Sequence, residues 1–98
     1  MTLSQLEYVV AAAKYQSFVK AADSCGVTQP TLSSMIQKLE SELDVIIFNR
    51  ASHPISETEA GAEIVKQAKI VIYNCNQLKE RVNQIKDGDS GKIDFSEQ

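Results

Sequence analysis

The apolar positions of the chain recur at helical spacing over most of its length, which predicts a mainly α-helical protein. The first helix is expected over about residues 2–14, where Thr2 and Gln5 have the spacing of a capping box. Its apolar positions lie three or four residues apart and therefore share one face: Leu3, Leu6, Val10 and Ala13.

Two more helices follow with a very short connection. The second is expected over about residues 17–25, with Ser17 as its N-cap and Gly26 as its stop. The third begins at Thr28, which can cap it, and Pro30 falls in its first turn, where a missing N–H costs little. Its apolar stripe consists of Leu32, Ile36, Leu39 and Leu43. Because only residues 26–28 separate the two helices, the pair has the spacing of a helix-turn-helix.

The helical period then gives way to a short β pattern. Residues 45–48 are an apolar, mostly β-branched run, residues 49–54 are rich in turn formers, and residues 55–56 can return as a second strand. A small hairpin after a helix-turn-helix predicts a mainly α fold: a winged helix-turn-helix whose wing is this β-hairpin.

A long final helix is expected over residues 58–87, with Thr58 as its cap and a length of about 45 Å. Its apolar positions are spaced alternately four and three residues apart, as in a coiled-coil seam: Ile64, Ala68, Val71, Cys75, Leu78, Val82 and Ile85. A second copy of the chain is the simplest cover for this stripe, so the seam predicts a homodimer. The alternative is that the helix folds back on its own domain, for which Val65, Ile70 and Ile72 lie off the seam.

The predicted organisation is a winged helix-turn-helix over residues 1–57, a linker and dimerisation helix over 58–87, and a flexible tail over 88–98. A chain of 98 residues suits one small domain. It begins with no signal-peptide pattern and contains no apolar run long enough to span a membrane, so we expect a soluble cytoplasmic protein without a membrane partner.

Residue counts argue against several chemistries. The chain has one histidine, His53, and two cysteines, Cys25 and Cys75, that are fifty positions apart. A zinc site, a disulfide framework and a His-based catalytic triad are therefore not expected, and no phosphate-binding glycine motif is present. We predict no enzyme activity, no metal and no cofactor.

The outward face of the third helix has the character of a DNA-recognition surface. The side chains on this face are short, polar and nearly free of acids, so the helix can approach the major groove closely. Gln29 can bond adenine, the Thr31 methyl can touch thymine, and Ser33 and Ser34 can reach a base edge or a phosphate. The alternative is an ordinary solvated helix face. The predicted DNA-binding residues are Lys20, Thr28, Gln29, Pro30, Thr31, Ser33, Ser34, Gln37, Lys38, Arg50 and His53.

The net charge of −3 weighs against nucleic acid unless positive charge is local. Lys20, Lys38, Arg50 and His53 are the expected phosphate contacts, with the N-termini of the second and third helices. The His53 contact would strengthen on protonation, although an ordinary exposed loop histidine explains this residue equally well. We expect modest affinity per protomer, so that two linked half-sites are needed. A protein-interaction module is the alternative function, because it fits the acidic balance.

The cysteines are expected to be packed rather than reactive. Cys25 ends the apolar face of the second helix, and Cys75 lies on the seam near the midpoint of the run from Ile64 to Ile85. In an antiparallel pair, Cys75 would approach its symmetry mate and crosslink on mild oxidation. A thiol sensor in this chain would need a cysteine with a low pKa, and neither sequence environment suggests one.

These residues together resemble the DNA-binding domain of LysR-type transcriptional regulators over residues 1–87. The similarity rests on stretches spread along the chain: 6–10, 17–18, 21–22, 27–33, Ile36, 39–40, 42–43, 48–50 and 58–61. Residues 21–25, together with 29–33, look most like the hydrogen-peroxide-responsive OxyR branch, which acts in oxidative stress.

The resemblance implies a homodimer through the linker helix, commonly antiparallel, and binding to an interrupted palindrome of double-stranded DNA. It also implies that five residues of the third helix face the groove, namely Gln29, Pro30, Thr31, Ser33 and Ser34, and that Arg50 and the wing lie on the DNA backbone. RNA polymerase is a candidate partner of the full-length protein. Ser34 and His53 stand where the family often has arginine, and Glu57 stands where an apolar residue is usual. Because family members continue into an effector domain, we expect this chain to be a DNA-binding fragment without a sensor of its own.

Overall fold

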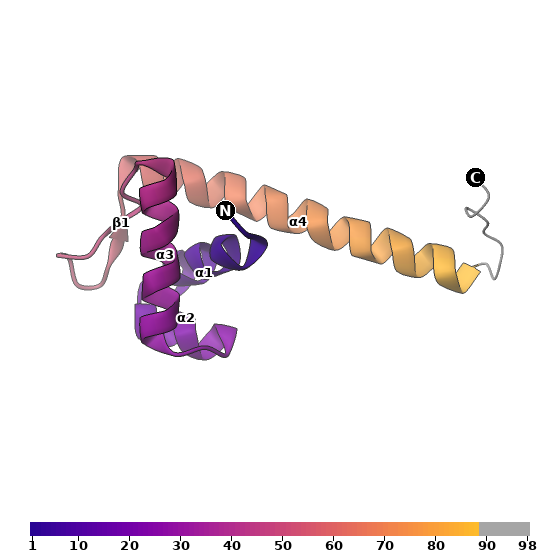
Figure 1. Ribbon diagram of the computed structural model, residues 1–98, viewed down its shortest axis with the longest axis horizontal. Helices are drawn as coiled ribbons and strands as arrows, with labels where there is room; N and C mark the ends of the chain where they lie inside the picture. The colour runs from indigo at the N-terminus through magenta and orange to yellow at the C-terminus, as the bar shows by residue number, and fades with distance from the viewer. Residues whose placement is uncertain (89–98) are drawn as a thin grey trace.

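The computed structural model describes residues 1–88, which form four helices and one small hairpin. In chain order these are α1 (Leu3–Tyr15), α2 (Phe18–Cys25), α3 (Gln29–Leu43), β1 (Phe48–Asn49), β2 (Ser56–Glu57) and α4 (Glu59–Gly88). Helices α1–α3 form the body, the hairpin projects from one end, and α4 extends far beyond the other end (Figure 1). The predicted winged helix-turn-helix with a long C-terminal helix is confirmed.

The helix ends follow from local side-chain chemistry, as the sequence predicts. The Thr2 hydroxyl accepts from the Gln5 backbone N–H at 3.1 Å, and the Gln5 side chain accepts from the Thr2 N–H at 2.8 Å, which completes the capping box of α1. Ser17 caps α2 by accepting from the Lys20 N–H. Gly26 ends α2 in the left-handed region with φ 73°, a conformation in which glycine has no Cβ penalty.

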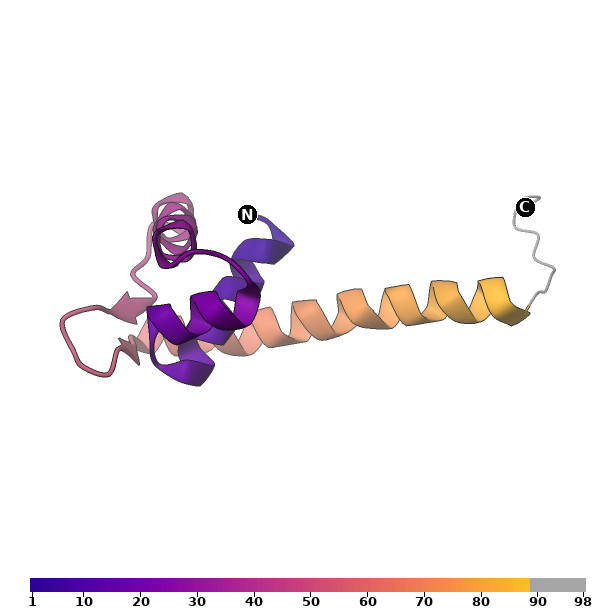
Figure 2. The same cartoon turned by 90° about the horizontal axis from the view of Figure 1, so that it is seen from below.

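The core lies where the body helices meet α1, which packs against α2, α3 and α4 (Figure 2). The fully buried positions of α1 are Val9 and Ala12, whereas Leu3, Val10 and Ala13 are only partly buried. The predicted apolar face of this helix was therefore misplaced, because α1 has neighbours on three sides and buries a face centred on Val9. The remaining core side chains are Leu6, Ala21, Ala22, Leu32, Ile36, Leu39, Ile47, Phe48, Ile55, Val65 and Ala68.

The hairpin is shorter than the sequence pattern suggests. Phe48 pairs with Glu57 and Asn49 with Ser56, so each strand has only two residues, and the predicted strand residues 45–47 stay outside the sheet. The physical reason is that the backbone N–H of Ile47 is bound to the Glu40 carboxylate instead of a neighbouring strand. The Phe48 ring packs edge-on against Phe18, with 5.9 Å between ring centroids.

The first turns of α4 belong to the core of the body. Val65 and Ala68 are buried, and Ile64 and Ile72 pack against the core. Of the predicted seam residues, Ala68 is therefore covered within the protomer and Ile64 is half-buried against the body, which leaves the seam exposed only from Val71 onward. Ile70 is 45% exposed and does not make the intramolecular contact suggested for it.

The predicted tail over residues 88–98 lies outside the described residues, apart from Gly88, which ends α4. Within residues 1–88, no helix is both long and apolar enough to cross a membrane. The same residues contain no group of His, Cys, Asp and Glu side chains suited to a metal ion.

Candidate nucleic-acid interface

The N-terminal half of α3 presents a polar surface at the end of the molecule that carries the hairpin (Figure 1). Its exposed residues are Pro30, Thr31, Ser34, Gln37 and Lys38, while Gln29 and Ser33 are half-buried at its edges. Leu32, Ile36 and Leu39 anchor the opposite face in the core. The structure thus brings the predicted groove-facing residues together on one exposed helix face.

The hydroxyls at the start of α3 are partly committed to the helix itself. The Thr28 hydroxyl accepts from the Thr31 backbone N–H at 3.3 Å and donates to the Thr31 hydroxyl oxygen at 2.9 Å. The Thr31 hydroxyl keeps its own proton for an outside acceptor. Thr28 is therefore foremost a cap that orients Thr31, and Thr31 is the hydroxyl available to DNA.

A DNA-binding chain with a negative net charge requires local positive charge, which the predicted phosphate contacts have to supply. Lys20, Lys38 and His53 are exposed. The first turns of α2 and α3 contain no acidic residue, so the positive ends of both helix dipoles are not neutralised there. Each of these helix ends can attract an anionic backbone.

Arg50 does not lie where the sequence predicted it. Its Nη1 donates to Glu40 Oε1 at 2.9 Å, and the guanidinium carbon lies 5.1 Å from the centre of the Phe18 ring. The other two side-chain nitrogens, Nε and Nη2, are buried. We correct the expectation that Arg50 is a free phosphate contact, because its guanidinium faces inward and supports the base of the hairpin.

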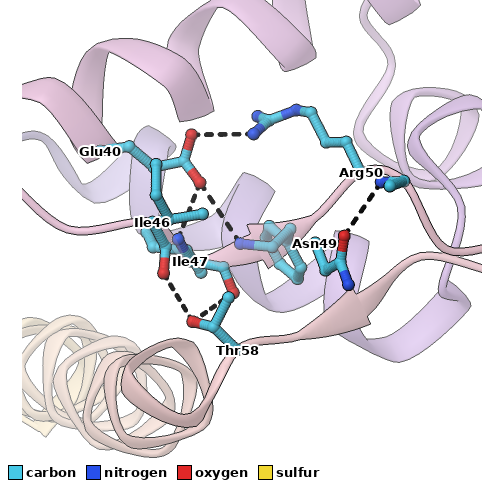
Figure 3. A network of polar contacts seen from close by, with 8 residues as sticks. Glu40, Ile46, Ile47, Asn49, Arg50 and Thr58 are labelled. Atoms are coloured by element: carbon cyan, nitrogen blue, oxygen red, sulfur yellow. Dashed lines mark hydrogen bonds and ion pairs between the residues drawn. The ribbon is translucent and has the colours of Figure 1, made fainter.

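Glu40 is the polar residue that sequence reasoning missed. Its side chain is only 6% exposed, and Oε2 accepts from the backbone N–H groups of Ile47 at 2.8 Å and Phe48 at 3.3 Å (Figure 3). Two sequence signals point to this role: Glu40 lies four residues after the buried Ile36, and Arg50 follows in the nearby turn.

A second surface runs along the outer part of α4. Val71, Leu78, Val82 and Ile85 are 37–65% exposed, and Cys75 is half-buried. These residues form the exposed part of the predicted seam, and within the described chain nothing covers them. We call residues 71, 75, 78, 82 and 85 the free seam.

Cys25 is packed against the core, as predicted. Burial raises the pKa of its thiol above the usual value, and the nearby Glu7 charge raises the pKa further. Because a thiolate is the reactive form, this environment argues against a thiol sensor at Cys25.

A helix-turn-helix, a two-stranded wing and a long C-terminal helix define the class of winged helix-turn-helix proteins. The sequence profile of the family described as "Bacterial regulatory helix-turn-helix protein, lysR family" matches residues 3–62. This chain belongs to the LysR family.

Curated relatives agree with this assignment. The chain is 44% identical over 93 residues to the "Hydrogen peroxide-inducible genes activator" of Dickeya chrysanthemi and to the "DNA-binding transcriptional dual regulator OxyR" of Escherichia coli (strain K12). Each match covers 95% of this chain and 30% of the relative. The chain therefore spans about a third of the length of these relatives.

Solved structures of the family share the fold over most of this chain. The crystal structure of the BenM DBD with catB site 1 DNA matches with a TM-score of 0.87 and 38% identity, covering 90% of this chain and 95% of that one. A full-length OxyR variant from Pseudomonas aeruginosa matches with a TM-score of 0.82 and 42% identity, covering 85% of this chain and 28% of that one.

Proposed function

We propose that this chain is the DNA-binding part of a bacterial LysR-type transcriptional regulator that activates genes in a peroxide response. The observation that carries the proposal is the exposed, acid-free N-terminal half of α3, together with the N-termini of α2 and α3, whose first turns contain no acidic residue. The BenM DBD, with which the chain shares its fold and 38% identity, is bound to DNA. The names of the curated relatives support the peroxide response.

In this account α3 enters the major groove and reads base edges. Gln29, Thr31, Ser33, Ser34 and Gln37 supply short donors and acceptors, and Pro30 packs beside them. Lys20, Lys38 and His53 contact phosphates together with the N-termini of α2 and α3. These contacts position the helix, while the base contacts give sequence preference.

Two protomers pair through the free seam of α4 and bind the two halves of an interrupted palindrome. Each protomer has few cations, so the second half-site supplies affinity that a single protomer lacks. In this proposal the chain only binds DNA, with no catalytic step and no cofactor. Binding takes place in the cytoplasm. In the full-length protein, RNA polymerase is the further partner that activation requires.

The test is selection of duplexes from a random-sequence pool by the purified 98-residue chain, followed by titration of the selected duplex at several salt concentrations. We expect a palindromic consensus, and a log–log salt slope of roughly −0.9 for each phosphate contacted. Footprinting on the DNA upstream of the gene for this chain should protect the same consensus.

The alternative is a winged-helix module that binds protein, and the net charge of −3 favours it. Absence of any enriched duplex, together with no binding to random DNA at low salt, would support this alternative and overturn DNA binding.

A further inference from the structure

A polar junction links the recognition helix α3, the hairpin and α4. It consists of Glu40, residues 46–48 and Thr58 (Figure 3). On one side, Glu40 of α3 accepts from the N–H groups of Ile47 and Phe48. On the other side, the Thr58 N–H donates to the Ile47 carbonyl at 2.9 Å, and the Thr58 hydroxyl donates to the Ile46 carbonyl. The Thr58 hydroxyl also accepts from the Gly61 N–H at 2.9 Å and so holds the first turn of α4.

Ile47 is therefore bound from both sides, through its N–H to α3 and through its carbonyl to the start of α4. Its side chain is fully buried, which removes the freedom to shift along the core. Gly61 lies so close to the Ile47 carbonyl that even a Cβ would not fit. The connection between the two helices is short, polar and tightly packed.

This junction matters because α3 and α4 share little direct contact within residues 1–88. Both helices pack on α1, and the segment between them contains only two-residue strands. Two features therefore fix the orientation of α4 relative to α3: the packing of both helices on α1, and the junction.

We propose that Glu40 and Thr58 are positioning residues that determine which half-site spacing the homodimer prefers. The inference rests on the proposed function. With α4 held in the dimer, a rotation at the junction turns the body of α1–α3 about the start of α4, and the recognition helix turns with it. In a symmetric homodimer both recognition helices turn, so the angle and separation at which they meet the two half-sites change together. Adjacent base pairs are only about 3.4 Å apart along the duplex, so a small rotation is enough to change the preferred spacing.

The experiment uses the duplex selected by the wild-type chain and a series with one or two base pairs inserted or removed between its half-sites. Kd is measured for each duplex by fluorescence anisotropy. The test variants are Thr58→Val, which keeps the shape but loses the hydroxyl, and Glu40→Gln. The controls are Thr58→Ser, which keeps the hydroxyl, and Glu42→Gln, which makes the same charge change on α3 at an exposed pair with the Met1 ammonium.

We expect wild type and both controls to share one preferred spacing. Spacing preference is the Kd for a duplex shifted by one base pair divided by the Kd for the preferred duplex. In Thr58→Val and Glu40→Gln this ratio should be about fivefold smaller than in wild type, because the loss of one hydrogen bond changes an equilibrium constant by about that factor. Circular dichroism checks that each variant is folded at the assay temperature. If Glu40→Gln is unfolded, Thr58→Val alone tests the inference.

An equal loss of affinity at every spacing would overturn the inference, because it would show that these residues only stabilise the fold. Wild-type protein that selects no duplex is a separate result, and it would overturn the proposed function itself.

Discussion

At the scale of single residues, Gln29 stands at the first position of α3, half-buried at the edge of the exposed face. Its amide can make two hydrogen bonds to adenine. We predict that Gln29→Ala weakens binding to the selected duplex by about 1–3 kcal/mol and relaxes base preference at one position. Titration against duplexes substituted at each position measures both effects.

The control is Gln67→Ala, the same change at an exposed position of α4, which should leave affinity and preference unchanged. A uniform loss of affinity with an unaltered base preference in Gln29→Ala would show that Gln29 does not read a base.

Arg50 and Lys38 test how a half-buried, paired cation differs from an exposed one. Arg50→Ala leaves the buried Glu40 carboxylate without its ion-pair partner, so we predict a loss of unfolding free energy of about 1–3 kcal/mol in urea denaturation. Lys38→Ala should leave stability unchanged and reduce the salt slope of DNA binding by about one.

If Arg50→Ala kept full stability and flattened the salt slope, the original prediction from sequence would be right after all. The ion pair with Glu40 would then have little part in holding the hairpin.

The caps and the Glu40–Arg50 pair show what sequence can reveal about single residues. Thr2, Ser17 and Gly26 were predicted correctly because capping depends on neighbours within a few positions. Arg50 was misplaced and Glu40 was missed, because their pairing depends on how the segment after α3 turns back toward it. No local rule specifies that turn.

At the scale of elements, the start of α4 presses against the segment before the hairpin. A Cβ built on Gly61 would lie 1.9 Å from the Ile47 carbonyl oxygen. We predict that Gly61→Ala destabilises the fold by about 1–3 kcal/mol through this overlap. Alanine normally stabilises a helix interior relative to glycine by about 0.5–1 kcal/mol. A loss of stability in Gly61→Ala would therefore be opposite in sign to the usual effect.

The matched control is Ala62→Gly at the next, exposed position of α4, which should also destabilise, by about 0.5–1 kcal/mol. Thermal and urea unfolding measure both variants. A more stable Gly61→Ala protein would contradict the close packing of α4 on Ile47.

The elements themselves were largely predictable. The starts of all four helices, and the ends of α1, α2 and α4, lie within one residue of the predicted bounds, because apolar periodicity and caps both mark them. The strands were less predictable, because Glu40 competes with the neighbouring strand for a backbone N–H group. The buried face of α1 was misjudged because it depends on three packing partners.

At the scale of the whole molecule, the structure changes the expected centre of the dimer. The protomer's own body buries Ala68 and half-buries Ile64, so the free seam runs from Val71 to Ile85 and its midpoint is Leu78. If two seams pair antiparallel about Leu78, the two Cys75 residues lie about 9 Å apart along the axis. That separation exceeds the usual Cα distance of a disulfide.

We therefore predict that Leu78→Cys, in a background with Cys25→Ser and Cys75→Ser, crosslinks readily when diamide oxidises two thiols to a disulfide. Wild-type protein should crosslink more slowly through Cys75. Nonreducing gels over time measure the rates. Equal or faster crosslinking through Cys75 would show that the centre of the dimer lies near Cys75, as the sequence alone suggested.

The candidate DNA surface was predictable as a set because its residues lie within one helix and its cap. The junction that supports this surface was not predictable, because it joins residues from α3, the segment before β1 and the start of α4. The sequence likewise showed the whole apolar seam of α4 but not which part the body would cover.

The most direct test of the central claim is to place a DNA-cleaving iron chelate on the α3 face. Ser34→Cys, in a background with Cys25→Ser and Cys75→Ser, carries the reagent, and Lys66→Cys on α4 is the control. We predict that the Ser34 reagent cuts the selected duplex at two symmetry-related places roughly a whole number of 10–10.5 bp turns apart. Bound duplex that is cut from Lys66 but not from Ser34 would contradict the account.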